Sequence, residues 1–207
     1  MIAVIDYGCG NLFSLSSSLK SLGQQVVITG DRAVLDRADR LILPGVGAFG
    51  DAADKLRQTG LDQAVLQAAK EGRFILGICL GMQLLFEKSY EYGTHTGLGL
   101  LPGEICPLAG DIAPELKIPH MGWNPLHFVK NDPLLVGSRE GQAFYFVHSY
   151  YAKGCEESLI ATAEYGVQVP ALVGKKNVYG AQFHPEKSGR AGLLLLDAFA
   201  KLNEKGK

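Results

Sequence analysis

The chain has 207 residues, of which 47% are hydrophobic and 20% are charged, so it is long enough for one domain with a substantial core. A net charge of −1 offers no basic face for nucleic acid and no polybasic patch for a membrane. No run approaches the roughly 18 apolar residues of a membrane span, and the first residues lack the flanking charge of a signal peptide. The four cysteines have no paired C-x-x-C spacing, so we expect a reduced, cytoplasmic protein without a disulfide framework.

The first half of the sequence alternates short apolar runs with helical periodicity. A leucine stripe from Leu12 to Leu22 follows Asn11, a favourable N-cap, and a second helical stretch over 51–71 is interrupted at Gly60. Apolar strands alternating with helices predict a parallel sheet covered on both faces. The apolar runs fall at residues 2–5, 25–29, 40–43 and 74–78.

From about residue 98 the pattern changes to short extended runs broken by Gly, Pro and Asn, which predict antiparallel hairpins that extend the sheet. Asn177 is typical of a turn with a solvated lysine tip, and a helix over 189–202 closes the chain. No linker or repeat divides the sequence, so we predict one α/β domain over residues 1–207, with a mixed, mostly parallel sheet and helices on both faces. The later extended runs fall at 126–128, 143–147, 160–164, 171–173 and 178–183.

Cys79 lies in the frame Gly-Ile-Cys-Leu-Gly at residues 77–81, between the apolar run 74–76 and a helix-like segment at 82–86. This is the layout of a nucleophile elbow, in which the flanking glycines let neighbouring backbone pass close to a strained residue. A helix N-terminus also favours thiolate over thiol. The alternative is a buried, inert cysteine.

A thiolate nucleophile needs a base, and the base needs an orienting group. His184 ends an apolar run, and in an extended segment Glu186 would project to the same side. Pro185 between them suits the end of a strand. Cys79, His184 and Glu186 would then form a triad. Two alternatives are a hydrogen-bonded structural histidine and a zinc site, although zinc usually requires three or four closely placed ligands.

A tetrahedral oxyanion also needs hydrogen-bond donors. The N–H of Leu80, just after the nucleophile, is the usual first donor in an elbow. The segment Pro44–Gly47 follows another strand and can supply a second backbone N–H, because its two glycines permit a peptide flip. The alternative is an ordinary Pro-Gly turn. The elbow, this segment and His184 all follow predicted strands, where active sites of parallel sheets collect.

Taken together, these features resemble the class I, triad-type glutamine amidotransferases, which have a flavodoxin-like fold. Members of that family hydrolyse the side-chain amide of glutamine through a cysteinyl thioester and release ammonia to a synthase partner. Five further segments are similar to the subgroup that forms heterodimers with the TIM-barrel cyclase of imidazole glycerol phosphate synthase, in histidine biosynthesis. These segments are Asp6–Asn11, Pro44–Gly47, Pro119–Asn124, Phe144–Tyr150 and His184–Ser188.

The resemblance implies roles for residues by position. Cys79, His184 and Glu186 would be catalytic, and the N–H groups of Val46 and Leu80 would hold the oxyanion. No metal or cofactor is implied. Glutamine would be held by Gly47, Gln83, His148, Ser149 and Tyr150, and the cyclase interface near the ammonia exit would include Asn11, Met121, Trp123, Tyr145 and Lys187.

Three other functions remain open from the sequence. The chain could be the glutaminase of another synthase, in pyridoxal phosphate, anthranilate or GMP synthesis, although Pro44–Gly47 and Met121–Asn124 favour the cyclase partner. It could be a stand-alone cysteine hydrolase, which would need no partner. It could also be a binding module with a dead site, an interpretation that the intact set of Cys79, His184 and Glu186 disfavours.

Overall fold

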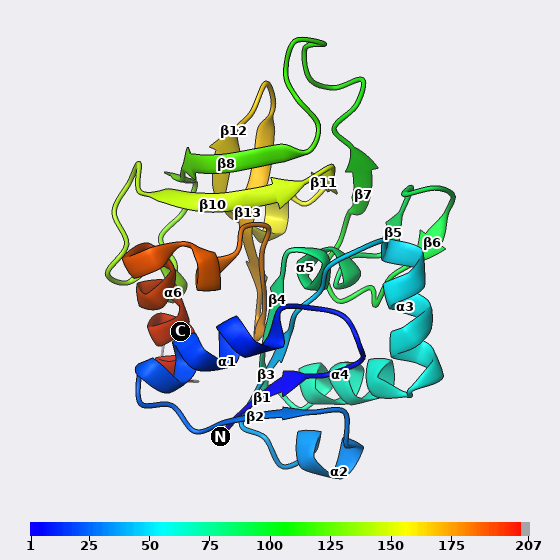
Figure 1. Ribbon diagram of the computed structural model, residues 1–207, viewed down its shortest axis with the longest axis vertical. Coiled ribbons are helices and arrows are strands. Elements are labelled where there is room, and N and C mark those ends of the chain that lie inside the picture. The colour runs from blue at the N-terminus through cyan, green and yellow to red at the C-terminus, as the bar shows by residue number, and fades with distance from the viewer. Residues whose placement is uncertain (204–207) are drawn as a thin grey trace.

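Five apolar runs become neighbouring parallel strands in an eight-stranded sheet, in the computed structural model, which describes residues 1–203 (Figure 1). Three antiparallel strands extend this sheet on one side, which confirms the mixed, mostly parallel architecture. In spatial order the strands are β2 (Val26–Thr29), β1 (Ile2–Ile5), β3 (Arg40–Leu43), β4 (Phe74–Ile78), β14 (Val178–Ala181), β13 (Gln168–Lys175), β12 (Leu159–Glu164) and β9 (His127–Phe128).

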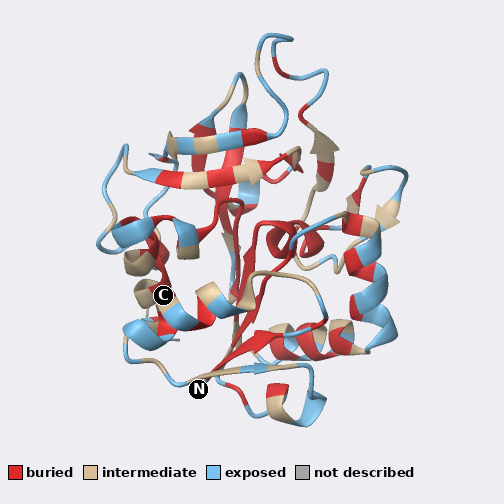
Figure 2. Ribbon diagram, viewed as in Figure 1, coloured by how far each residue is buried: buried red, intermediate tan, exposed pale blue. Residues whose placement is uncertain are grey.

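Helices cover both faces of this sheet because alternate strand residues point to opposite sides. Ile2 and Val4 pack with α1 (Leu12–Ser21) and α6 (Gly189–Lys201), whereas Ala3 and Ile5 pack on the face of α3 (Phe49–Gln58) and α4 (Leu61–Lys70). The central strands are buried along their length (Figure 2). Each fully buried Leu or Ile contributes about 1.5–3 kcal/mol relative to exposure, so these two layers hold the sheet together.

Side-chain caps and glycines set the helix ends. Asn11 caps α1, with its Oδ1 accepting a hydrogen bond from the N–H of Ser14 at 3.5 Å. The helical stretch predicted over 51–71 begins two residues earlier and is divided at Gly60, which has φ 70°. It therefore forms α3 (Phe49–Gln58) and α4 (Leu61–Lys70). The short helix α2 (Arg32–Leu35) was not expected from the sequence.

Two small sheets stand beside the main one. The run predicted at 143–147 does not extend the main sheet as expected, because β10 (Ala143–His148) pairs instead with β8 (His120–Pro125). The pair lies next to the β12–β13 hairpin (Figure 1). The other small sheet contains β11 (Tyr150–Lys153), β7 (Glu104–Pro107), β5 (Lys88–Ser89) and β6 (His95–Thr96). The remaining elements are α5 (Leu80–Leu84), η1 (Pro133–Leu135), η2 (Glu156–Ser158) and η3 (Pro185–Lys187).

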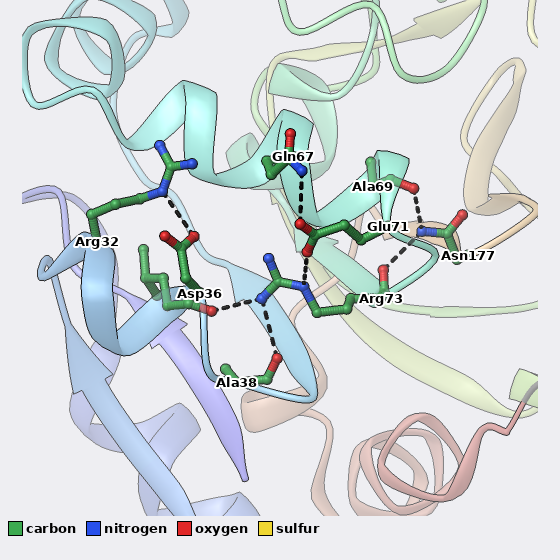
Figure 3. Close-up of polar contacts among 9 residues, drawn as sticks. Arg32, Asp36, Ala38, Gln67, Ala69, Glu71, Arg73 and Asn177 are labelled. Atoms are coloured by element: carbon green, nitrogen blue, oxygen red, sulfur yellow. Dashed lines mark hydrogen bonds and ion pairs between the residues drawn. The ribbon is translucent and has the colours of Figure 1, made fainter.

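A cluster of polar side chains connects the loops at the end of the sheet where the parallel strands begin (Figure 3). Asn177 donates from Nδ2 to the carbonyls of Ala69 at 3.0 Å and Arg73 at 2.8 Å. Arg73 in turn donates to the Leu35 carbonyl at 2.7 Å and pairs with Glu71 at 2.9 Å. Asn177 is thus a tertiary anchor as well as the expected turn residue.

The described residues 1–203 include no helix that is both long and apolar enough to cross a membrane.

Candidate active site

Cys79 occupies a strained turn between β4 and α5. Its φ of 53° and ψ of −112° are unusual for a residue with a side chain, and such strain is typical of functional positions. Gly81 makes the turn possible, because a Cβ there would lie 1.8 Å from the carbonyl oxygen of Leu43. The strand–cysteine–helix layout expected from the sequence is therefore present.

His184 and Glu186 meet at the carboxyl end of β14. His184 Nδ1 lies 2.9 Å from Glu186 Oε1, and each side chain is only 4% exposed. The sequence predicted an extended segment here, which is wrong: Pro185 begins the 3₁₀ helix η3, and that turn brings the two side chains together. Because Glu186 occupies Nδ1, the Nε2 atom is the one left to serve Cys79.

Residues 184–188 are hydrogen-bonded to β10. The N–H of His184 donates to the Tyr145 carbonyl at 2.9 Å. Ser188 completes the link, because its hydroxyl donates to the His184 carbonyl at 2.7 Å and accepts from the Tyr145 N–H at 3.0 Å. Ser188 is 2% exposed, so this buried hydroxyl fixes η3 against the strand.

The pKa of His184 is raised to about 9. Burial by itself lowers this pKa, but hydrogen bonds and charge interactions with Cys79 and Glu186 raise it further than burial lowers it. His184 is therefore an imidazolium at neutral pH, placed against the sulfur of Cys79. A cation in this position favours the thiolate, which is the nucleophilic form of cysteine.

The segment Pro44–Gly47 packs directly on the elbow. A Cβ on Gly45 would lie 2.8 Å from the Tyr7 hydroxyl and 2.9 Å from the Gly81 nitrogen, so Gly45 is required for close approach. The hydroxyl of Tyr7 donates to the Pro44 carbonyl at 2.8 Å, and burial raises the Tyr7 pKa, which keeps this donor protonated. Within the segment, Gly47 has the positive φ, at 99°. Leu80 begins α5, so its N–H has no acceptor within the helix.

A pocket of about 410 Å³ opens over Cys79. Gln83 lies in its wall, with Nε2 donating to the Tyr150 carbonyl and to Gln182 Oε1, both at 3.0 Å. Its Oε1 atom is consequently the part that can accept a hydrogen bond from a ligand. The pocket is lined by Val46, Gly47, Cys79, Leu80, Gln83, Glu91, Pro119, Val147, His148, Ser149, Tyr150, His184 and Lys187.

Glu91 is a pocket carboxylate that sequence reasoning missed. Its Oε2 accepts from the N–H of Phe49, at the start of α3, at 2.6 Å, and burial raises its pKa. No motif marks this residue, because it reaches the pocket from the segment between β5 and β6. It places a negative charge in a pocket that also contains Lys187.

The ring of His148 is engaged within the protein. Its Nδ1 lies 2.9 Å from the Tyr150 carbonyl and its Nε2 lies 2.9 Å from His120 Nδ1. Burial, followed by the charge of His120, lowers the pKa of His148 to about 3, so the ring is neutral. His148 ends β10 and Tyr150 begins β11, so Ser149 alone separates the two strands.

Of the residues predicted to contact a partner, Lys187 lines the pocket, and Trp123 and Tyr145 lie close to it. Trp123 and Tyr145 are register partners across β8 and β10, with ring centroids 6.0 Å apart, and Lys187 Nζ lies 5.9 Å from the Tyr145 ring. Met121 is 60% exposed and Trp123 is 56% exposed. Asn11 lines a small void beside His184 and Glu186.

Within the described part of the chain, residues 1–203, no group of three or more His, Cys, Asp or Glu side chains is arranged to hold a metal ion.

A family model, Glutamine amidotransferase class-I, matches residues 3–201. The chain belongs to this family. A Bacillus subtilis (strain 168) protein named "Imidazole glycerol phosphate synthase subunit HisH" is 54% identical over 205 residues, covering 98% of this chain and 96% of the relative. A Listeria monocytogenes protein of the same name is 46% identical over 202 residues, covering 98% and 96%.

Solved structures show the same fold at lower sequence identity. A structure titled "Crystal structure of glutamine amidotransferase" superposes with a TM-score of 0.74 at 20% identity, covering 96% of this chain and 99% of the other. The "Structure of PurLQS from Thermotoga maritima" gives 0.73 at 22% identity, covering 96% of each chain. These likenesses support the fold assignment.

Proposed function

We propose that this chain is the glutaminase subunit of an imidazole glycerol phosphate synthase: it hydrolyses glutamine to glutamate and ammonia and passes the ammonia to a cyclase subunit. The cyclase uses it to form imidazole glycerol phosphate and aminoimidazole carboxamide ribotide in histidine biosynthesis. The observation that carries this proposal is full-length identity of about one half to proteins with that subunit name, combined with Cys79, His184 and Glu186 at one pocket.

The geometry supports a thioester mechanism. The Cys79 thiolate attacks the amide carbon of glutamine, and the resulting oxyanion is held by the N–H groups of Leu80 and Val46. His184 gives its Nε2 proton to the departing nitrogen, which leaves as ammonia. Water then loses a proton to His184 and cleaves the thioester, releasing glutamate and restoring the thiolate. Glu186 holds the imidazole in place throughout.

Glutamine recognition follows from the charges and amides of the pocket. The α-ammonium needs acceptors, and Glu91 and the Oε1 atom of Gln83 supply them. The ring of His148 is occupied inside the protein, so its contribution to binding comes through the shape and backbone of the β10–β11 connection. Gly47, Ser149 and Tyr150 line the same pocket.

The partner surface is the exposed face formed by β8 and its surroundings. Met121 and Trp123 are exposed on β8, and Trp123 lies beside Tyr145, whose ring is also near Lys187. Exposed aromatic and methionine side chains are typical of interface centres. We infer a heterodimer with a TIM-barrel cyclase docked here, in the cytoplasm, where the four free cysteines stay reduced.

The proposal is tested by measuring glutamate release from glutamine by the purified chain, alone and with a cyclase subunit and its nucleotide ligand. We expect strong stimulation by the liganded partner. Full activity of the chain alone would instead indicate a stand-alone hydrolase. Stimulation by a pyridoxal phosphate, anthranilate or GMP synthase partner would assign the chain to another pathway.

The pKa of His184 sets an alkaline limit on activity. A pKa raised to about 9 means that the imidazolium persists at neutral pH and is lost as the pH rises through about 9. We therefore expect kcat/KM for glutamine in the complex to fall above about pH 9, because the ion pair with Cys79 disappears. A pH profile with glutamate detection checks this, using ammonium-dependent synthesis as the control for the cyclase. Activity that still rises through pH 10 would contradict the assigned protonation.

A further inference from the structure

Gln182 is a buried amide next to Cys79, and the sequence analysis assigned no role to it. It directly follows β14 and is 0% exposed. Its backbone N–H donates to the Ala171 carbonyl at 2.9 Å, which fixes the residue to β13. Its side-chain Nε2 lies 3.8 Å from Cys79 Sγ, and its Oε1 lies 3.0 Å from Gln83 Nε2. A fully buried amide must use its donors and acceptors within the protein.

A backbone carbonyl determines which end of this amide faces the sulfur. The Tyr150 carbonyl can only accept, so Gln83 must turn its Nε2 group toward it, at 3.0 Å. The second hydrogen of that group then requires an acceptor, so Gln182 presents Oε1 to Gln83. The Nε2 group of Gln182 is left to point at Cys79. The same Tyr150 carbonyl is also held by His148 Nδ1 at 2.9 Å.

The sulfur therefore has two kinds of polar neighbour. The Val147 carbonyl, 3.7 Å away, accepts a hydrogen bond from the thiol and so favours the protonated form. The Gln182 N–H, like the imidazolium of His184, interacts best with a negatively charged sulfur. We propose that Gln182 is a catalytic residue, whose side-chain amide donates a hydrogen bond to the Cys79 thiolate and increases the thiolate fraction available to attack glutamine. This rests on the assignment of Cys79 as nucleophile under the proposed function.

The test measures the thiolate directly. The full chain is alkylated with iodoacetamide from pH 5 to 10, and labelling of Cys79 is quantified by peptide mapping. In Gln182→Met, which removes the donor but keeps the length of the side chain, we expect the midpoint of the alkylation profile to move up by about one pH unit, the equivalent of one charge-assisted hydrogen bond. The substitution leaves in place the other titratable side chains around the pocket, which are Tyr7, Glu91, His148, His184, Glu186 and Lys187.

Two further variants separate this role from a structural one. Gln182→Glu keeps an oxygen to accept from Gln83 but places a carboxylate at the sulfur, so we expect an upward shift at least as large. Gln142→Met changes a half-buried amide immediately before β10, at the opposite end of the strand from Val147, and should leave the midpoint unchanged. Circular dichroism spectra and melting temperatures identify the folded variants.

The outcomes distinguish this proposal from the one on which it rests. An unshifted midpoint in folded Gln182→Met, with Cys79 still alkylated more readily than Cys106, overturns the role of Gln182 alone. A wild-type Cys79 that is alkylated no more readily than Cys106 at neutral pH contradicts the nucleophile itself, and with it both proposals.

Discussion

Replacing Cys79 with alanine should reduce glutamine-dependent synthesis by the complex at least about 10⁴-fold, the scale seen when a nucleophile that works with a base is removed. Synthesis from added ammonium salts should remain intact, because ammonia then reaches the cyclase without the thioester step. Alanine lacks the sulfur but fits the same turn, so the backbone at φ 53° should be retained. Glutamate release and imidazole glycerol phosphate formation, measured in parallel, check both halves of this expectation.

A matched variant separates the loss of the nucleophile from a general effect of losing a cysteine. Cys106 lies half-buried on β7, away from the pocket lining, and Cys106→Ala should keep both activities. If Cys79→Ala loses the ammonium-dependent reaction as well, while size-exclusion chromatography still shows the complex, the division of labour between the two subunits is wrong.

Gly81→Ala should lower the free energy of unfolding by about 3 kcal/mol, near the upper end of what overpacking costs. The added Cβ would lie 1.8 Å from the Leu43 carbonyl oxygen and 3.1 Å from the Pro44 carbonyl carbon, which are backbone atoms that cannot turn aside. The chain must therefore separate the elbow from the segment Pro44–Gly47. Thermal unfolding should show a drop in Tm of roughly 6–12 °C, and glutaminase activity of the folded fraction should fall because the oxyanion donors no longer face the nucleophile.

The comparison for this variant is a glycine that is constrained only by its backbone angle. Gly141 has φ 77° and no atom within 4 Å of an added Cβ, so Gly141→Ala should cost only about 1–2 kcal/mol and leave activity unchanged. Equal destabilisation by the two substitutions would show that the close approach at Gly81 relaxes easily.

The sequence alone predicted the parallel half of the fold, because nearly continuous apolar runs and the helical leucine stripe are local signals. It also placed Cys79, His184 and Pro44–Gly47 at strand ends, where the structure brings them together. It failed where tertiary pairing overrides local composition. Strand β8 contains glycine and proline and forms only because β10 pairs with it.

Two polar residues of the site, Glu91 and Gln182, were beyond sequence reasoning for a related reason. Glu91 reaches the N–H of Phe49 across 42 residues, and Gln182 reaches Cys79 across 103 residues. Neither belongs to a local motif of known chemistry, and only the folded chain shows which atoms face each other. The turn at Pro185 was misjudged because proline is equally suited to ending a strand and to beginning a short helix.

The attachment of His184 to β10 has a consequence for evolution and engineering. The strand that holds the base through Tyr145 and Ser188 is paired with β8, which carries Trp123 on its exposed face. Under the proposed function, partner recognition and placement of the base reside on one two-stranded ribbon. To redirect the subunit to a different synthase, the β8–β10 pair and η3 would have to be exchanged together. Selection for a new partner would therefore also change the rate of glutamine hydrolysis.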